Sequence, residues 1–373
     1  MKIFYVNPMS RNNLAQYDIN LLESLSNLDD DLKIRYFCSE GVDYQLKNIS
    51  KFPIFSYFIH RRPIIKAVYY IITLFKFFFI TAKDKPDLIH FQWLKIPVID
   101  LTLLFFLERF LNVKCFLTVH NLIPHRPNFL DKVFYALIYR TVSGLFVHEN
   151  HARKKLVDIF GIPDSRITTI PHGPLRVRPR PFESLSNDVT SIVSRSKNIV
   201  LCMGRLSNYK GIDLLIESWA EMPQEYLKQF TLVFAGTADD SITANVRQQI
   251  HSHPNTFWIN RYLTDTDLHH LIESSSAIVI PYKRISQSGV LFTAIGHEKP
   301  FLVTDIGGLT DPLNVAKIGW SCAPDVHSLK NGIQDMCEVL LRGGVVCESN
   351  WHKVRQIFSW DLAARVTLDG YKI

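Results

Sequence analysis

The chain has 373 residues, of which 47% are hydrophobic and 12% aromatic. This is enough apolar material for two ordinary domains, and it excludes an intrinsically disordered chain. The six cysteines are widely spaced, with no CxxC pair and no metal-ligand spacing, so we expect free thiols in a reducing compartment. The net charge of +7 is unevenly distributed: residues 1–175 carry +7, residues 176–198 carry +3 and residues 199–373 carry −3. Nucleic acid and an anionic membrane surface both suit a basic half, and of the two we expect the membrane surface and no nucleic acid.

Apolar, strand-like runs alternate with helical stretches along the whole chain. In the first half we expect a helix at 14–26 and strands at 2–6, 33–37, 87–91, 113–120, 144–148 and 167–173. In the second half we expect helices at 212–221, 240–251, 265–274 and 289–297, and strands at 198–204, 230–236, 256–260, 277–281 and 300–305. Such alternation predicts parallel sheets that are covered by helices on both faces.

The stretch from 176 to 198 is rich in proline, arginine and serine, which is typical of a linker. We therefore expect an α/β protein of two Rossmann-like domains facing a cleft, with an N-terminal domain at 1–175, a linker at 176–198 and a C-terminal domain at 199–356. The first strand begins directly, without a charged leader or a cleavable apolar core, so we expect a cytoplasmic protein.

The region from Lys47 to Lys85 combines eight basic residues with one acid, Asp84, and many aromatic residues. Its apolar core, PIIKAVYYIITLFKFFFI, is long enough to span a membrane, but each central lysine costs roughly 2.5–3.5 kcal/mol on insertion scales. A helix that lies in the headgroup plane fits this pattern better, and the alternative is a long buried helix with snorkelling lysines. The residues expected to meet anionic lipid are Arg61, Arg62, Lys66 and Lys76.

Ligands of doubly wound sheets bind at the carboxyl ends of the strands, and two such ends in the second half carry an anion-binding pattern. In MGRLSNYKG, Gly204 lets the chain turn, while Arg205 and Lys210 offer two cations. In QSGV, a helix that begins near Ser288 presents the backbone N–H groups of Ser288, Gly289 and Val290 with the positive end of its dipole. The alternatives are two solvated surface cations and an ordinary capped helix. Together the motifs predict a diphosphate site, and the lack of GxGxxG after any strand argues against a dinucleotide enzyme.

These residues resemble the family 4 glycosyltransferases, which are retaining nucleotide-sugar transferases of the GT-B fold. The resemblance is dense over GRLSNYKGID, RYLTDTDLHHLIESSSAIVIPY and QSGVLFTAIGHEKPFLVTDIGG, and it is thinner over DLIHFQW, TVHNLIPH and TIPHG in the first half. It implies a nucleotide-sugar-binding C-terminal domain, and a C-terminal helix at 357–373 that returns to the N-terminal domain.

The resemblance also assigns roles to single residues. Arg205 and Lys210 would hold the diphosphate and stabilise the leaving nucleotide, and His120 would face the donor sugar. The donor would further contact Gly204, the base-pocket loop of Arg261, Tyr262 and Leu263, and the residues Gln287, Ser288, Gly289, Val290 and Thr293. Weaker acceptor contacts are expected from Arg11, Asn12 and Asn13, where many relatives have paired glycines. A histidine after an apolar strand is also often a buried structural residue, which is the alternative for His120.

Besides the loop at Arg11–Asn13, the chain departs from the family pattern in the donor site. Relatives usually place two glutamates near the sugar and the ribose, where this chain has Ile285 and Thr293. Thr293 retains a hydroxyl for the ribose, but Ile285 does not replace a carboxylate. No Asp-x-Asp motif lies at a strand end, so we expect no metal and no cofactor, with Arg205 and Lys210 in the role that a metal plays elsewhere.

The function that we expect from the sequence is sugar transfer. A UDP- or GDP-sugar would donate to a lipid-linked saccharide at the cytoplasmic face of the membrane, during assembly of a bacterial surface polysaccharide such as a lipopolysaccharide or exopolysaccharide. The alternatives are a catalytically silent GT-B-like protein that binds nucleotide or membrane, and a GT-B-fold nucleotide-sugar epimerase.

Overall fold

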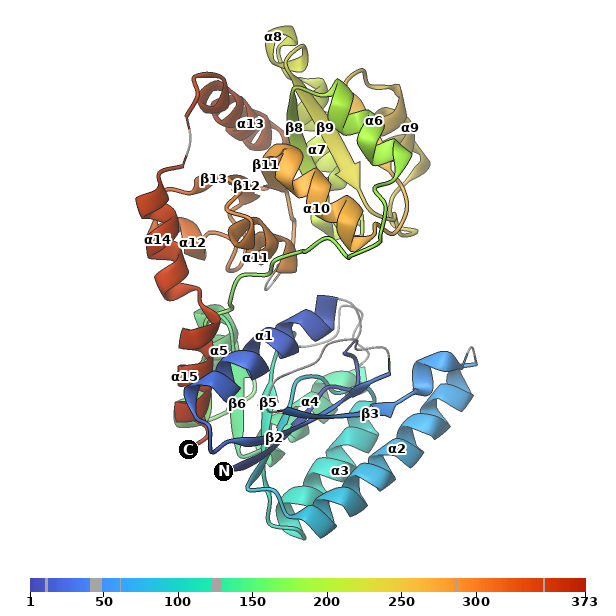
Figure 1. The fold of residues 1–373 in the computed structure, drawn as a ribbon, viewed down its shortest axis with the longest axis vertical. Helices are drawn as coiled ribbons and strands as arrows, with labels where there is room; N and C mark the ends of the chain where they lie inside the picture. Colours follow the sequence, from blue (N-terminus) through green and yellow to red (C-terminus); the bar gives the residue numbers. More distant parts are fainter. Residues whose placement is uncertain (11–12, 41–48, 61, 123–128, 286–287, 345) are drawn as a thin grey trace. The chain divides into compact units, whose positions relative to one another are not determined.

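A computed structural model describes residues 1–10, 13–40, 49–60, 62–122, 129–285, 288–344 and 346–373. The chain forms two compact units (Figure 1). Unit 1 comprises Met1–Gly173 together with Phe358–Ile373, and unit 2 comprises Pro174–Ile357. Each unit contains a parallel sheet covered by helices, which confirms the predicted α/β class with two Rossmann-like domains.

Unit 1 is built on a seven-stranded parallel sheet of order β3-β2-β1-β4-β5-β6-β7. Its strands are β1 (Lys2–Val6), β2 (Lys33–Ser39), β3 (Ile49–Phe55), β4 (Leu88–Phe91), β5 (Lys114–Thr118), β6 (Gly144–Val147) and β7 (Ile167–Thr169). Its helices are α1 (Asn13–Leu28), α2 (Pro63–Asp84), α3 (Pro97–Arg109), α4 (Phe129–Thr141), α5 (Asn150–Asp158) and α15 (Trp360–Gly370), with short 3₁₀ turns at Tyr57–Ile59 and Asp164–Arg166.

Two helical layers cover this sheet. The helices α2, α3, α4 and α5 pack on one face, where buried residues such as Tyr70, Phe77, Leu104 and Ile138 form one core. Helices α1 and α15 pack against each other on the opposite face, in a second core. The C-terminal helix α15 therefore belongs to unit 1, although most of unit 2 precedes it in the chain.

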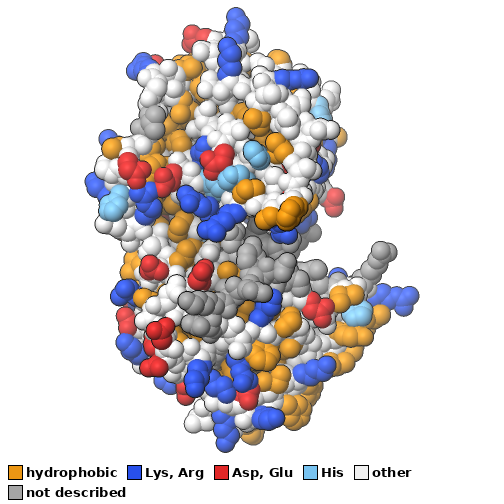
Figure 2. All heavy atoms as spheres, in the orientation of Figure 1, with side chains coloured by type: hydrophobic (Ala, Val, Ile, Leu, Met, Phe, Trp, Pro, Cys, Tyr) orange, Lys and Arg blue, Asp and Glu red, His pale blue; other side chains and the backbone are white. Residues whose placement is uncertain are grey.

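Helix α2 begins at Pro63, whose fixed φ suits the first helical position, and ends at Lys85 in the left-handed conformation with φ 44°. Among the described residues it is the one helix long and apolar enough to cross a membrane. Hydrophobic and basic side chains gather at the surface over this helix (Figure 2).

Unit 2 has a six-stranded parallel sheet of order β10-β9-β8-β11-β12-β13. Its strands are β8 (Asn198–Met203), β9 (Phe230–Ala235), β10 (Thr256–Ile259), β11 (Ser275–Ile280), β12 (Phe301–Thr304) and β13 (Gly319–Cys322). Its helices are α6 (Asn187–Arg195), α7 (Ile212–Ala220), α8 (Gln224–Leu227), α9 (Ala244–Ser252), α10 (Asp265–Ser274), α11 (Gly289–Gly296), α12 (Asp311–Val315), α13 (Val326–Leu341) and α14 (Glu348–Ile357), with a 3₁₀ turn at Asn208–Lys210.

The stretch 176–198, expected as a linker, forms part of unit 2. It ends in helix α6, and side chains tie it to the body of the unit. The Ser186 N–H and hydroxyl donate to Asp267 at 2.9 and 2.8 Å, and the Arg180 Nε lies 2.8 Å from Asp265 Oδ2. The composition of this stretch did not indicate that it packs on unit 2, because its polar residues make specific hydrogen bonds to α10.

Gly211 closes the 3₁₀ turn after β8, and we expect it to tolerate no side chain. Its φ is 68°, and a Cβ there would lie 1.8 Å from the carbonyl oxygen of Pro281. Gly343, also in unit 2, has a φ of 72°, and a Cβ there would meet no atom within 4 Å, so it serves as the matched control. Gly343→Ala should lower the free energy of unfolding by roughly 1–2 kcal/mol, the cost of a left-handed alanine. Gly211→Ala should lose clearly more in urea unfolding, and equal losses would contradict the predicted clash.

Candidate active site

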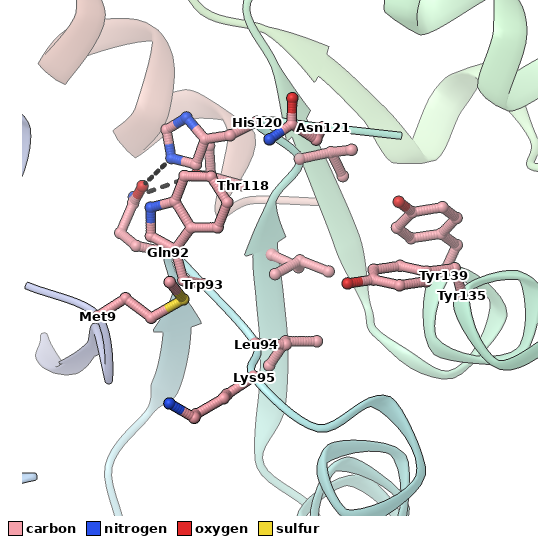
Figure 3. Close-up of a pocket in the computed structure, with 12 residues that line it drawn as sticks. Met9, Gln92, Trp93, Leu94, Lys95, Thr118, His120, Asn121, Tyr135 and Tyr139 are labelled. Carbon is pink, nitrogen blue, oxygen red and sulfur yellow. Dashed lines mark hydrogen bonds between the residues drawn. The ribbon is translucent and has the colours of Figure 1, made fainter. Parts of the chain in front are cut away.

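A pocket of about 240 Å³ opens in unit 1 at the carboxyl ends of β4 and β5 (Figure 3). Two segments line much of it: Gln92–Lys95, which follows β4, and Val119–Asn121, which follows β5. Met9, Tyr135 and Tyr139 complete the wall. This is the edge where ligands of such sheets bind, so the pocket is the candidate site of this unit.

His120 lies in this pocket and is held on two sides. Its ring stacks on Trp93, with centroids 4.7 Å apart and planes 9° from parallel. Its Nε2 lies 2.9 Å from the side-chain oxygen of Gln92 (Figure 3). The Gln92 nitrogen in turn lies 3.1 Å from Thr118 Oγ1 and 3.3 Å from His90 Nε2. Because this orientation leaves the amide oxygen for His120, the imidazole donates from Nε2 and its Nδ1 carries the lone pair.

The hydrogen bonds continue from Gln92 to the C-terminal helix. His90 contacts Thr118 Oγ1 at 2.7 Å through Nε2 and the hydroxyl of Tyr371 at 2.6 Å through Nδ1. Tyr371 is the residue that caps α15. A buried polar chain thus runs from the last helix of the sequence to His120, entirely within unit 1.

The histidines around His120 are held neutral. Burial, followed by the neighbouring His148, lowers the pKa of His120 well below its usual 6.5. Burial likewise lowers the pKa of His148 to about 4 and that of His172 to about 3. Edge-on contacts with Tyr17 connect these three rings. His120 is therefore suited to keep its Nε2–H on Gln92 and to accept a hydrogen bond at Nδ1, and it is unsuited to carry a charge near neutral pH.

Sequence reasoning missed Gln92 and Trp93. Both follow β4 directly, so the strand-end rule that selected His120 would also have selected them. Of the weaker predictions in unit 1, Asn13 is the first residue of α1, Arg62 precedes α2, and Lys66 and Lys76 lie on α2. Arg11, Asn12 and Arg61 lie outside the described residues, as does Gln287 in unit 2.

In unit 2 the structure brings Gly204, Lys210 and the start of α11 together. Gly204 has a φ of 99° and directly follows β8. The nearest atoms to a Cβ placed on it would be Lys210 Nζ at 3.0 Å and Val290 Cγ2 at 3.6 Å. Lys210 therefore reaches back over the glycine, and Val290 in the first turn of α11 approaches the same side of it. The two motifs that the sequence predicted to share a ligand are neighbours in space.

Lys210 is half-buried, and among the described residues no carboxylate lies within ion-pair distance of its Nζ. Burial lowers its pKa and nearby Arg205 acts in the same direction, while Tyr209, Cys202 and Asp239 oppose this shift. The nearest aromatic ring, Tyr282, has its centroid 5.3 Å from Nζ. Lys283, which follows Tyr282, is by contrast paired with Asp213. Because buried charges are normally paired, the position of Lys210 calls for an anionic ligand.

Arg205 and the start of α11 are the other members of the candidate anion site. The Arg205 side chain is 73% exposed, and its only described ion pair is a long one, 3.9 Å from Nε to Asp239 Oδ2. Ser288 caps α11 by accepting from the Leu291 N–H at 3.4 Å, and its own hydroxyl contacts the hydroxyl of Tyr282 at 3.4 Å. The first N–H groups of any helix have no acceptor within that helix, so Gly289 and Val290 can present theirs to a ligand. Thr293 is buried and donates its hydroxyl to the Gly289 carbonyl at 2.8 Å, which leaves its oxygen only as an acceptor.

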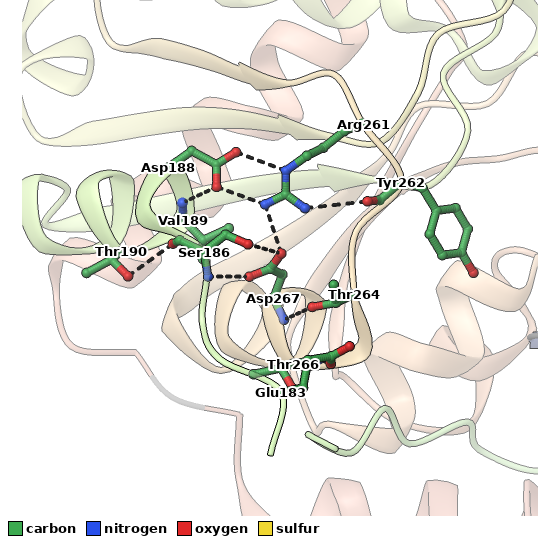
Figure 4. A network of polar contacts seen from close by, with 10 residues as sticks. All are labelled: Glu183, Ser186, Asp188, Val189, Thr190, Arg261, Tyr262, Thr264, Thr266 and Asp267. Carbon is green, nitrogen blue, oxygen red and sulfur yellow. Dashed lines mark hydrogen bonds and ion pairs between the residues drawn. The ribbon is translucent and has the colours of Figure 1, made fainter. Parts of the chain in front are cut away.

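The loop after β10 has one residue in a polar network, Arg261, and one exposed ring, Tyr262 (Figure 4). The Arg261 guanidinium lies 2.8 Å from both Asp188 and Asp267, which raises its own pKa and lowers that of Asp188. It therefore ties α6 to α10. The ring of Tyr262 is exposed and points away from this network, and Leu263 is half-buried. Any base contact from this loop falls to these two residues and to the backbone.

Among the described residues, one group has metal-ligand spacing: His269, Glu273 and His297. Both His297 nitrogens are already engaged, Nδ1 with Glu273 at 2.7 Å and Nε2 with the Val177 N–H at 3.0 Å. His269 Nδ1 contacts the Val177 carbonyl at 3.1 Å. This group holds the segment around Val177 against α10 and the end of α11.

Comparisons with known proteins give a family match in each of the two units. The family model described as Glycosyltransferase Family 4 matches residues 16–173, and that described as Glycosyl transferases group 1 matches residues 197–338. Glycogen synthase of Hydrogenovibrio crunogenus is 24% identical over 193 residues, 49% of this chain and 39% of that protein. An uncharacterised glycosyltransferase of Methanocaldococcus jannaschii is 23% identical over 247 residues, 64% of this chain and 62% of that protein. The matches thus span less than two thirds of either relative.

Solved structures share the whole fold. Sucrose-phosphate synthase of Thermosynechococcus elongatus has a TM-score of 0.74 at 16% identity, covering 100% of this chain and 98% of that one. HepE of Anabaena, solved with UDP-glucose, has a TM-score of 0.71 at 15% identity, covering 100% of both chains. With a matching model in each unit and a GT-B fold throughout, the chain belongs to the family 4 glycosyltransferases.

The contact between Gln92 and His120 predicts a specific titration behaviour. Gln92→Glu places a carboxylate against His120 Nε2–H, which favours the imidazolium and should raise the pKa of His120 by about one unit or more. Gln92→Met removes the acceptor without adding charge. The pKa of His120 should stay low, and its proton should no longer be fixed on Nε2. Both variants are measured by NMR of the His120 imidazole from pH 8 down to the lowest pH at which the protein stays folded, with the wild type neutral near neutral pH. An unchanged His120 pKa in Gln92→Glu would contradict the assigned contact.

Proposed function

We propose that this protein transfers a sugar from a UDP- or GDP-sugar to a lipid-linked saccharide acceptor, with retention of the anomeric configuration. It would work in the cytoplasm, attached peripherally to the inner face of the membrane, during assembly of a bacterial surface polysaccharide. Its family membership supports the reaction class, and the fold that it shares with HepE, solved with UDP-glucose, is compatible with such a donor. The single observation that carries the proposal is Lys210, which is half-buried beside Gly204 and the start of α11 and has no carboxylate within ion-pair distance among the described residues.

The proposed chemistry depends on stabilising the leaving group. As the bond between the sugar and the diphosphate breaks, negative charge grows on the β-phosphate oxygen. Cations and N–H groups already fixed at that position stabilise the transition state more than the ground state. Lys210, Arg205 and the first N–H groups of α11 are the groups proposed for this role, with no metal or other cofactor. His120 of unit 1, whose Nε2–H is held by Gln92, is proposed to present its Nδ1 lone pair to a hydroxyl of the donor sugar.

The proposal is tested with the purified full chain, a panel of UDP- and GDP-sugars, and a polyprenyl-diphosphate saccharide in detergent. Nucleotide release that requires the acceptor supports transfer, and NMR of the product's anomeric proton tests retention. Isomerisation of the donor sugar without acceptor would instead identify an epimerase. Nucleotide binding without turnover of any donor would identify a silent protein, and either result overturns the proposal.

Arg205→Ala and Lys210→Ala should each lower kcat by about 10²–10³-fold, the usual loss when a transition-state donor is removed. Both side chains can be removed without breaking a described short ion pair, so circular dichroism and the melting temperature should stay near those of the wild type. Lys228→Ala, an exposed lysine elsewhere in unit 2, is the charge-matched control and should keep full activity. Near-normal turnover in either site variant would refute the proposed diphosphate contacts.

A further inference from the structure

The outer side of three neighbouring helices in unit 1 is apolar. Helices α2, α3 and α4 all cover the same face of the sheet, and α3 packs against both of the others. Each turns one stripe of residues, spaced three or four apart, away from the core. The exposed apolar side chains of these stripes and of the residue after α3 are Ile64, Ile65, Val68, Tyr69, Ile72, Phe75 and Phe79 on α2, Val98, Phe105, Phe106 and Phe110 on or after α3, and Leu130, Val133 and Leu137 on α4. We call this surface the apolar face.

Helix α5 shows what an ordinary helix of this layer looks like. It packs on the same side of the sheet through Ala152 and Leu156. Its exposed residues include His151, Lys154 and Asp158, the polar pattern expected of a solvated helix. Three adjacent helices with exposed apolar stripes depart from this pattern, and contiguous patches of this kind mark interaction surfaces.

The charges on the apolar face are positive. Helices α2, α3 and α4 carry four carboxylates. Three of them are turned to internal partners: Asp84 pairs with Arg35, Asp100 accepts from Tyr70 at 2.6 Å, and Glu108 accepts from the Cys115 N–H at 2.8 Å. The fourth is Asp131, which is half-buried. The exposed charged side chains along the three helices and at the start of α2 are basic: Arg62, Lys76, Lys83, Arg109, Lys132 and Arg140.

Helix α2 packs on unit 1 along its length and does not project from it. Its inner stripe is part of the core, where Tyr70 and Phe77 are fully buried. The Tyr70 hydroxyl also fixes Asp100, whose other oxygen accepts from the Lys95 and Ile96 N–H groups at the start of α3. Crossing a membrane would expose this inner stripe and break these hydrogen bonds. Of the two ways in which an apolar helix can meet a bilayer, the structure therefore favours lying in its surface.

We infer that the apolar face is a bilayer-docking surface, on which α2, α3 and α4 insert aromatic and aliphatic side chains together while the basic residues meet anionic headgroups. The inference deepens the membrane location of the proposed function, on which it rests, by adding α3 and α4 to the helix that the sequence indicated. A second copy of this chain is the less suitable occupant. A symmetric pair would bring the basic residues of two faces together, whereas anionic lipid supplies the opposite charge.

The test is sedimentation of the full chain with vesicles of phosphatidylcholine, with and without 30% phosphatidylglycerol. One substitution per helix probes the face: Phe79→Glu on α2, Phe110→Glu at the end of α3 and Leu130→Glu on α4, whose side chains are 67%, 67% and 58% exposed. Ile159→Glu, next to α5 and 66% exposed, is the matched control outside the face. Each face variant should lower the partition coefficient on anionic vesicles about tenfold, since a carboxylate replaces an inserted apolar group and repels the headgroups. The control should bind like the wild type.

Several results would overturn the inference. These are equal binding to neutral and anionic vesicles, loss of binding only in Phe79→Glu, and equal losses in the Ile159→Glu control. A change from dimer to monomer in light scattering of the face variants without lipid would also overturn it, because it would identify a second copy as the occupant. Donor-dependent nucleotide release with a short-chain acceptor in detergent keeps the two proposals apart. Normal release without vesicle binding refutes the docking surface alone, and vesicle binding without release refutes the proposed function alone.

Discussion

The candidate anion site of unit 2 depends on one conformational constraint, a turn at the end of β8 that only glycine makes easily. Gly204, with φ at 99°, ends the strand, and Gly211, with φ at 68°, packs against the Pro281 carbonyl. Between them the chain makes a 3₁₀ turn that returns Lys210 over Gly204 and beside Val290. This turn half-buries the lysine at a position where no carboxylate of the described residues lies within ion-pair distance. A nucleoside diphosphate would supply the missing negative charge.

The pocket of unit 1, by contrast, is built around uncharged polar groups. It contains a histidine whose burial keeps it uncharged, oriented by Gln92 and stacked on Trp93. The hydrogen-bonded chain through His90 to Tyr371 makes this orientation depend on the last helix of the sequence. This gives α15 a part in the pocket's geometry besides its packing on α1.

Much of this fold could be predicted from the sequence because parallel strands buried on both faces are continuous apolar runs. The expected strands from 2–6 to 300–305 are present, whereas β3 and β13 were missed. β3 contains Lys51 and Pro53 and is buried only at its two end residues, and β13, GWSC, is short and only partly buried. Helix α9 starts at Ala244, four residues later than expected, because Thr243 caps it by accepting from the Val246 N–H.

The candidate site was predictable where chemistry follows a strand end, as at Gly204 and His120. It was not predictable where a residue's partners come from distant segments. Nothing local to Arg261 indicates that Asp188, 73 positions earlier, pairs with it. The exposed stripes of α3 and α4 were missed for a similar reason. An apolar helix of a doubly wound domain is expected to be buried, and only the packed structure shows which of its side chains are left outside.

The central claim is that Lys210 and its neighbours bind a diphosphate, and calorimetric titration tests it most directly. The measurement compares a nucleoside diphosphate with the corresponding monophosphate, UDP with UMP and GDP with GMP, for the wild type and for Lys210→Ala. The account predicts that the wild type binds one diphosphate about tenfold or more tighter than its monophosphate, and that Lys210→Ala loses most of this preference while still binding the monophosphate. Equal affinity of the wild type for both nucleotides, or an undiminished preference in Lys210→Ala, would contradict it.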